Sequence, residues 1–298
     1  MARNATLDYA RLIASIGIIV FHVGAPGAAV GYAALPFFLM LLIFLAFPTA
    51  VERDFGTYAA TRIARLMWPW AIWCLIYAAL KLAEVAIAGV PLKSEFAVWM
   101  LLAGPSIHLW FLPFACFACI AIWPLARLSN SLPERGRTIC GMVLSGLTAL
   151  IAWITHDLVV AQPFAQWLYA LPAVALGSAF GFLGRTYHPT MMTALAVAIT
   201  TGLLLALNWP DGAGQLAMAG LAFTLCLALP LRDRPVARRM ADLSLTLYLA
   251  HPMVISILLR VPPIPDKSSE MAISAVASTV LLALGLQKLQ TFIVFRVT

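Results

Sequence analysis

Ten continuous apolar stretches, each of about 20 residues, decide what this chain can fold into. A helix of that length crosses the hydrocarbon core of a bilayer, whereas a membrane-spanning strand needs only about ten residues of alternating polarity. The stretches do not alternate, which excludes an outer-membrane barrel and favours helices. The expected spans cover residues 10–25, 32–51, 66–87, 108–126, 139–156, 165–184, 190–208, 215–231, 242–259 and 271–290.

The composition agrees with a chain that is solvated by lipid. Hydrophobic residues make up 63% of the 298 residues and charged residues only 10%, against about 25% in an average soluble domain. We therefore predict an all-α integral membrane protein, a polytopic bundle of about ten transmembrane helices. Only the connections at 52–65 and 88–107 are long. We expect residues 1–298 to form a single transmembrane domain with no appended soluble domain.

The basic residues predict the orientation of the chain. The formal net charge is +7, and fifteen of the 19 Lys and Arg residues lie at one set of span ends. Cytoplasmic loops carry such an excess, so we expect both termini in the cytoplasm. The basic residues are scattered rather than gathered on one face, which argues against nucleic acid as a partner. A cleaved signal peptide is the alternative for the N-terminal segment, but Asp8 and His22 are untypical of one.

An ionisable residue inside a span marks a candidate functional position, because it costs about 2.5 kcal/mol or more to insert. His22 follows Arg11 by eleven residues, which in a helix corresponds to about 16 Å along the axis and about 20° around it. We expect both residues on one face, with His22 near mid-membrane, and Asp8 one turn before Arg11 to hold its guanidinium. His22 is a candidate general base. A structural hydrogen bond to a neighbouring helix is the alternative.

Two further motifs lie at span ends. Arg62 and Arg65, at positions i and i+3, open the third span on one face, and their guanidinium groups suit phosphate oxygens. Orientation by the positive-inside rule is the alternative. His108 and Trp110 begin the fourth span at the expected outer face, where an interfacial aromatic anchor is the alternative.

His251 lies at a predicted depth near that of His22. The proline that follows it, Pro252, frees a backbone carbonyl that His251 or Tyr248 could satisfy. A role in a helix kink therefore competes with a catalytic one.

Several other patterns have simpler interpretations. Cys116 and Cys119 have metal-like spacing but no second ligand pair, so we expect apolar packing and no metal. Gly177 and Gly181 have the spacing of closely approaching helices. The sequence contains no Walker loop, nucleophile elbow or HExxH motif, so an ATPase, a serine hydrolase and a zinc protease have no support.

Together these motifs resemble the membrane-bound acyltransferase family 3, bacterial enzymes that O-acylate the sugars of surface and secreted glycans. The resemblance covers nearly the whole chain. The sequence shows no periplasmic esterase-like domain of the kind some members carry, and its first outer loop is unusually short. The matching segments are Leu7-Asp8-x-x-Arg11, His22, Arg62-x-x-Arg65, His108-Leu-Trp-Phe-Leu and Tyr248-Leu-Ala-His251-Pro252.

The resemblance implies transfer of an acyl group, acetyl or succinyl, from cytoplasmic acyl-CoA to a hydroxyl of a surface or exported glycan or lipid-linked saccharide. Acyl-CoA would be a co-substrate, with no permanently bound cofactor, and the protein would lie in the bilayer of the bacterial cytoplasmic (inner) membrane as a multi-pass protein. No activated nucleophile competes with the histidine base, so we favour direct transfer. We assign His22 and Arg11 to catalysis, Arg62 and Arg65 to donor binding, and Asp8, His108, Trp110, Tyr248 and His251 as additional candidates.

Two other functions are compatible with the sequence. A proton-coupled secondary transporter also combines about ten spans with buried ionisable groups, although no internal repeat or pair of broken helices is visible. An inactive relative could serve as a scaffold in a glycan-export complex.

The charge asymmetry predicts a labelling pattern. Cysteines introduced singly as Arg135→Cys and Lys93→Cys in a cysteine-free background should react with a membrane-impermeant thiol reagent from opposite sides. Position 135 should react only from the cytoplasm and position 93 only from outside, because basic residues are retained on the cytoplasmic side. The reverse pattern would contradict both the orientation and a cytoplasmic donor site.

Overall fold

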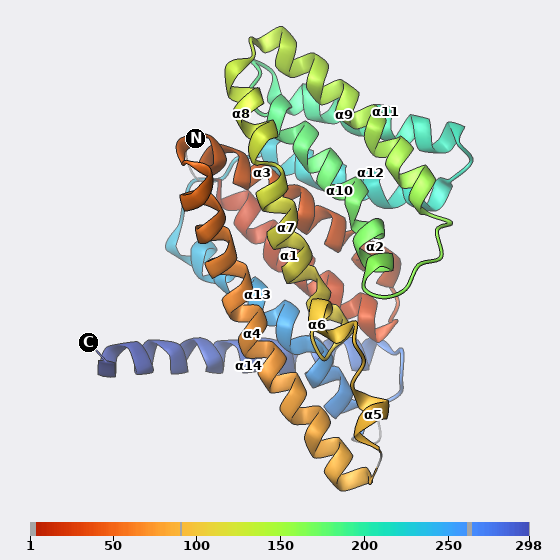
Figure 1. Ribbon diagram of the computed structural model, residues 1–298, viewed down its shortest axis with the longest axis vertical. Helices are drawn as coiled ribbons and strands as arrows, with labels where there is room; N and C mark the ends of the chain where they lie inside the picture. Colours follow the sequence, from red (N-terminus) through yellow and green to blue (C-terminus); the bar gives the residue numbers. More distant parts are fainter. Residues whose placement is uncertain (1–3, 90, 261–263, 298) are drawn as a thin grey trace. The chain divides into compact units, whose positions relative to one another are not determined.

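The computed structural model describes residues 4–89, 91–260 and 264–297, and within these ranges the chain is helical and contains no strand. Ten described segments are long and apolar enough to cross a membrane, which confirms the all-α fold and the ten spans predicted from the sequence. The cytoplasmic location of the termini stays a prediction, and Arg3, one of the fifteen basic residues behind it, lies outside the described residues. The helices (Figure 1) are α1 (Ala5–Val23), α2 (Ala28–Tyr32), α3 (Ala34–Glu52), α4 (Phe55–Ala88), α5 (Leu92–Glu95), α6 (Met100–Ala103), the 3-10 helix η1 (Ile107–Trp110), α7 (Phe111–Ala121), α8 (Trp123–Ser131), α9 (Glu134–Thr155), α10 (Phe164–Leu183), α11 (Pro189–Ala206), α12 (Pro210–Ala228), α13 (Pro235–Leu258) and α14 (Ser269–Val297).

The third span begins earlier than predicted. Residues 55–65, which we expected in a connection, form the first turns of α4. The carboxylate of Asp54 accepts a hydrogen bond from the Thr57 amide at 2.9 Å, which caps the helix and lowers the pKa of the Asp54 carboxyl. With 34 residues, α4 is about 50 Å long, more than the hydrocarbon core of about 30 Å. Its polar first turns therefore escape a search for apolar stretches.

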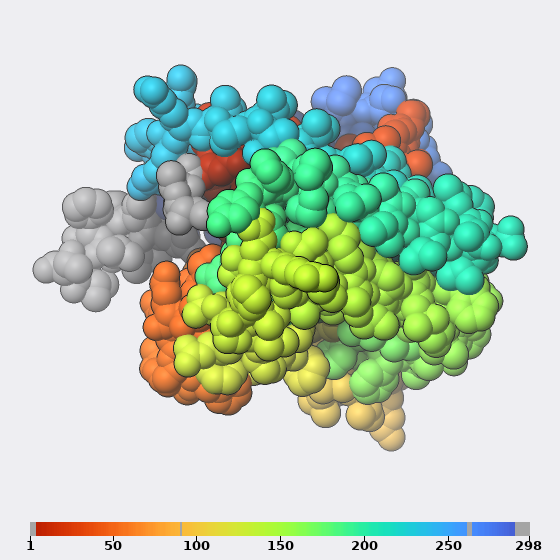
Figure 2. All heavy atoms as spheres, turned by 90° about the horizontal axis from the view of Figure 1, so that it is seen from above, coloured from red at the N-terminus to blue at the C-terminus, as the bar shows by residue number. Residues whose placement is uncertain are grey.

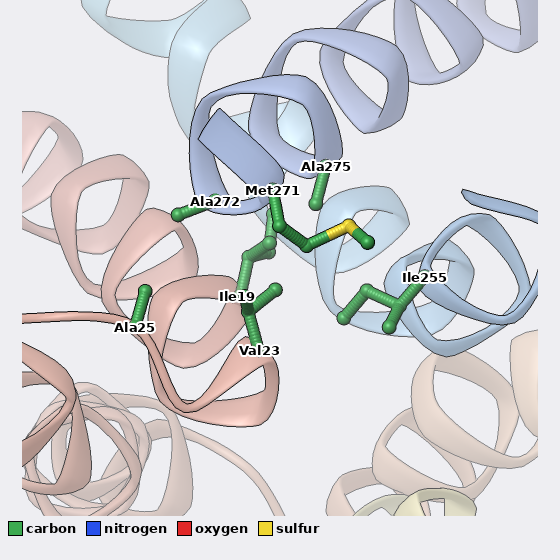
Figure 3. Packing of buried hydrophobic residues seen from close by; sticks show 7 residues of the cluster. All are labelled: Ile19, Val23, Ala25, Ile255, Met271, Ala272 and Ala275. Carbon is green, nitrogen blue, oxygen red and sulfur yellow. The ribbon is translucent and has the colours of Figure 1, made fainter. Parts of the chain in front are cut away.

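The chain divides into two compact units, and the first contains residues 1–38 and 218–298. Here α1 packs against α13 and α14, and α13 packs against α14. An apolar cluster joins these three helices, which fixes the position of α1 relative to α13. It consists of Ile19, Val23, Ala25, Ile255, Met271, Ala272 and Ala275 (Figure 3).

The second unit contains residues 39–217. Within it, α9 packs against both α10 and α11, and α4 packs against α7. The side chains of α9 and α11 meet at the surface shown in Figure 2, where α9 is yellow-green and α11 turquoise. The hydrogen bond from the Tyr58 hydroxyl to the Cys119 carbonyl places the first turns of α4, which carry Arg62, beside α7.

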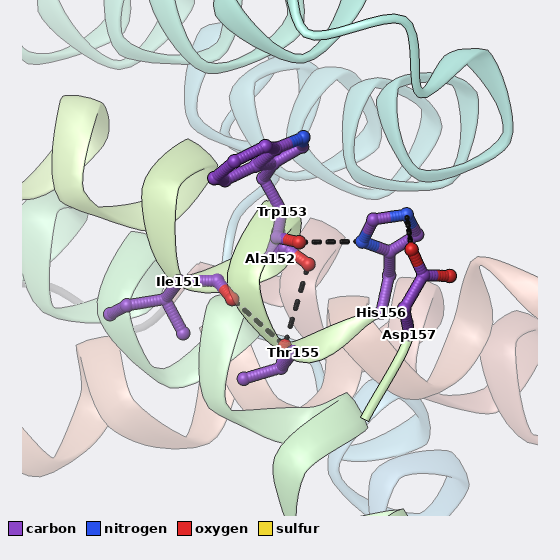
Figure 4. A network of polar contacts seen from close by, with 6 residues as sticks. All are labelled: Ile151, Ala152, Trp153, Thr155, His156 and Asp157. Carbon is purple, nitrogen blue, oxygen red and sulfur yellow. Dashed lines mark hydrogen bonds and ion pairs between the residues drawn. The ribbon is translucent and has the colours of Figure 1, made fainter. Parts of the chain in front are cut away.

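A polar network ends α9 in this unit (Figure 4). The Nδ1 atom of His156 lies 2.5 Å from the Trp153 carbonyl oxygen, and its Nε2 atom lies 3.0 Å from a carboxylate oxygen of Asp157. The imidazole also packs on the ring of Trp209, with 4.9 Å between ring centroids. The network therefore satisfies a carbonyl in the last turn of the helix, where the helix itself supplies no donor.

The close helix approach predicted at Gly177 and Gly181 is confirmed. A Cβ atom on Gly177 would lie 2.8 Å from the Cα atom of Met40 in α3, and one on Gly181 would lie 2.6 Å from the ring of Phe47. Neither contact leaves room for a methyl group. The two glycines therefore let α10 lie against the backbone of α3.

This contact predicts opposite effects for two glycine substitutions. Gly177→Ala should lower the free energy of unfolding by about 1–3 kcal/mol, because the new methyl group meets a backbone atom that cannot move aside. Gly202→Ala in α11 is the matched control, because nothing lies within 4 Å of its Cβ position. It should stabilise the helix by about 0.5–1 kcal/mol. Thermal unfolding in detergent micelles measures both, and equal effects would contradict the packing.

Candidate active site

The predicted residues of the N-terminal span lie on one unbroken helix. Asp8 lies in the first turn of α1, Arg11 follows it, and His22 lies in the last turn, before Gly24 ends the helix with a φ of 71°. The unbroken helix preserves the small angular offset between Arg11 and His22. The expected mid-membrane depth of His22 stays a prediction.

The structure brings His22 and His251 together. The centroids of the two rings are 4.9 Å apart, with 38° between the ring planes. His251 is fully buried in α13, whereas the side chain of His22 is exposed. Two imidazolium cations at this separation would repel each other by about 3 kcal/mol at an effective dielectric of about 20. Repulsion of this size disfavours a state in which both rings are charged.

The hydrogen bonds of His251 define the state of its ring. Its Nδ1 atom lies 2.7 Å from the Tyr248 carbonyl oxygen and 3.3 Å from that of Leu247. A carbonyl oxygen only accepts, so Nδ1 carries the hydrogen and donates it. Of the two residues that the sequence offered for the carbonyl freed by Pro252, His251 and Tyr248, it is His251 that makes this bond. The Tyr248 ring lies 5.9 Å from the His251 ring, so this candidate also belongs to the cluster.

Two contacts that the sequence did not reveal hold His22 in place. The Ser15 hydroxyl on α1 shares its hydrogen between the Arg11 carbonyl at 3.0 Å and the Ser244 carbonyl on α13 at 3.2 Å, and the second contact links the two helices that carry the histidines. The ring of Phe21 lies edge-on to His22 and stacks on Tyr32, with centroid distances of 5.3 Å in both cases. A lone serine in an apolar helix carries no signal of its own in the sequence.

Asp8 and Arg11 lie near the other end of α1. Asp8 is buried and within electrostatic reach of Arg238 on α13, which itself forms a two-bond ion pair with Asp233. Arg11 is half-buried. The expected contact between Asp8 and the guanidinium of Arg11 stays a prediction.

Arg62 and Arg65 lie in the second unit and have different surroundings. Arg65 is exposed, whereas only 8% of Arg62 is exposed. The guanidinium of Arg62 donates to the Thr49 hydroxyl, and its Cζ atom lies 5.0 Å from the centroid of the Tyr58 ring. The Tyr58 hydroxyl in turn donates to the Cys119 carbonyl at 2.7 Å. The predicted pair is thus split, because residues three apart on a helix point about 60° apart.

The charge of Arg62 has no carboxylate partner among the described residues. Its Nε atom is buried and has no hydrogen-bond acceptor in the described part of the chain. Two buried free cysteines of α7, Cys116 and Cys119, lie nearby. A buried cation with only neutral neighbours is costly, and an anion that enters beside it would offset that cost.

His108 and Trp110 are buried in the second unit, each with 6% exposed. The Nδ1 atom of His108 lies 2.9 Å from the Ser106 hydroxyl oxygen, and the Tyr77 ring packs edge-on at 5.0 Å. The Trp110 ring lies 5.7 Å from that of Phe114. An interfacial aromatic anchor would face the lipid headgroups, whereas these side chains are buried, and the role of the motif stays a prediction.

The predicted residues are therefore divided between the two units, and the structure brings together His22, His251 and Tyr248. Thr49 and Tyr58, which support Arg62, were missed by sequence analysis. Tyr58 precedes Arg62 by one helical turn and could have been noticed, but Thr49 belongs to another helix. The first unit holds Asp8, Arg11, His22, Tyr248 and His251, and the second holds Arg62, Arg65, His108 and Trp110.

Comparison with known proteins identifies the family. The sequence model of the acyltransferase domain family matches residues 4–287. No curated protein and no solved structure matches the chain. The family match covers nearly the whole chain and agrees with its ten candidate spans. The chain therefore belongs to acyltransferase family 3, and it is a multi-pass membrane acyltransferase.

Proposed function

We propose that this acyltransferase transfers an acetyl or succinyl group from acyl-CoA to a hydroxyl of a surface or exported glycan or lipid-linked saccharide. The observation that supports the donor most directly is the buried guanidinium of Arg62. It has an acceptor-free Nε atom and no carboxylate partner among the described residues. A polyanionic donor such as CoA supplies the missing negative charge.

The surroundings of Arg62 suit a phosphate oxygen. Tyr58 supports one face of the guanidinium, and Thr49 accepts one of its hydrogen bonds. The remaining N–H groups are held in a fixed fork, the geometry that binds phosphate with two parallel hydrogen bonds. Because CoA is a cytoplasmic metabolite, this proposal places the Arg62 cluster on the cytoplasmic side of a bacterial inner membrane.

The histidine pair supplies the base for the transfer. The acceptor hydroxyl attacks the carbonyl carbon of the thioester while its proton moves to the imidazole of His22. The carbon–sulfur bond then breaks, and the CoA thiolate leaves and takes up the proton from the imidazolium. His22 is exposed and His251 is fully buried, so we assign the contact with the hydroxyl to His22.

Release of CoA tests the proposal. Purified protein in lipid vesicles should convert acetyl-CoA or succinyl-CoA to free CoA when a saccharide acceptor is present, as measured with a thiol reagent. No increase in thiol with any acyl-CoA or acceptor would contradict the proposed donor. Uptake of a solute into the vesicles driven by a proton gradient would instead favour a transporter.

The donor cluster predicts unequal roles for the two arginines. Arg62→Lys should weaken acetyl-CoA binding by about 10-fold or more, because a point charge loses the two-bond fork. Arg65→Lys is the matched control and should weaken binding less, because exposed ion pairs contribute little. Isothermal titration calorimetry measures both affinities, with thermal unfolding as a check on folding. Unchanged acetyl-CoA affinity in Arg62→Ala would indicate that Arg62 serves only to orient the chain in the membrane.

The histidine pair predicts a loss of turnover with donor affinity retained. His22→Gln should lower kcat by about 10² to 10⁴, because an amide makes hydrogen bonds but accepts no proton at neutral pH. The exposed His188 offers the control His188→Gln, for which near-normal turnover is expected. The wild-type rate should fall at acidic pH, where the imidazole is already protonated, and His22→Gln should lack this dependence. Near-normal turnover of His22→Gln with the same loss of rate at acidic pH would give His22 a structural role and make His251 the general base.

A further inference from the structure

A proline in α13 changes the hydrogen bonding beside the histidine pair. Pro252 lies inside this helix. In a regular helix the amide of residue 252 would donate to the carbonyl four residues earlier, which is that of Tyr248. Proline has no amide hydrogen, so that donor is missing.

The imidazole of His251 takes the place of the missing donor. Its Nδ1 atom lies 2.7 Å from the Tyr248 carbonyl oxygen, the distance of a good hydrogen bond, and 3.3 Å from that of Leu247. The carbonyl that Pro252 releases is thus the one that His251 approaches most closely. Pro252 removes the amide that would donate to this oxygen atom, and the imidazole of His251 donates to the same atom.

This bond determines which nitrogen of the neutral ring can accept a proton. With the hydrogen on Nδ1, the lone pair lies on Nε2. The bond also fixes the plane of the His251 ring, which packs on His22 at 4.9 Å. Without this bond, either ring nitrogen could carry the hydrogen, and the ring that packs on His22 could rotate.

We propose that Pro252 is a positioning residue that holds His251 in the Nδ1–H tautomer by leaving the Tyr248 carbonyl to it. The tautomer follows from the geometry alone, and only its effect on turnover rests on the proposed function. Pro252→Ala restores an amide that competes for this carbonyl. A carbonyl oxygen has two lone pairs, so the competing amide weakens the histidine bond rather than abolishing it.

Nitrogen NMR of protein labelled with ¹⁵N-histidine tests the tautomer directly. The chain has five histidines, and a sample of His251→Asn identifies the signals of His251 by their loss. At a pH at which the His251 ring is neutral, the wild type should show a protonated Nδ1 and an unprotonated Nε2. Pro252→Ala should add a second population with the proton on Nε2. A wild-type ring protonated on Nε2 would overturn the proposal, even if the variant failed to fold.

Kinetics test the consequence for the reaction. Pro252→Ala should lower kcat about fivefold to tenfold, the usual worth of one hydrogen bond, and leave KM for acyl-CoA unchanged. The control Pro69→Ala restores an amide in α4, a helix of the other unit, and should leave both the His251 signals and kcat as they are. An unchanged His251 tautomer together with unchanged kcat in Pro252→Ala would overturn the positioning role. Absence of acyl transfer in a wild type with the Nδ1–H tautomer would contradict the proposed function alone.

Discussion

An ionisable side chain in an apolar helix must find its partners within the protein, because hydrocarbon offers none. The arrangement of the histidine pair depends on this constraint. His251 meets it with a backbone carbonyl that Pro252 releases, and the same bond orients the ring beside His22. Arg62, in the polar first turns of α4, has the related cost of a buried charge, which the Tyr58 ring and the Thr49 hydroxyl offset only in part. The partly satisfied group is the one that we expect to receive an anion.

The two clusters divide the chemistry between them. In the proposed function the cluster around Arg62 binds phosphate, whereas the histidine pair takes up the hydroxyl proton. The proposed transfer from CoA would need both functions, because the donor would be bound by its phosphates and would react at its thioester. The proposed function would therefore account for two costly buried polar groups in one acyltransferase chain.

The sequence predicted the spans well because the length of an apolar helix is fixed by the bilayer. It placed the start of the third span about ten residues too late, because an end capped by Asp54 and rich in polar side chains lacks the apolar signal. Counting residues predicted a similar depth for His22 and His251 but not their contact. That contact depends on how α1 and α13 pack, through Ser15 and the apolar cluster with α14. The burial of Arg62 but not Arg65 likewise depends on α3 and α7, which no local pattern reveals.

Mass analysis of surface glycans tests the central claim, O-acylation of a glycan, most directly. Bacterial cells that express the wild-type chain should carry glycans heavier by one acetyl or succinyl group per modified sugar than cells without it. Cells with equal amounts of His22→Gln protein should have the unmodified masses. Identical glycan masses with and without the wild-type protein would contradict the account, and an acyl group that persists in the His22→Gln cells would contradict the assigned base.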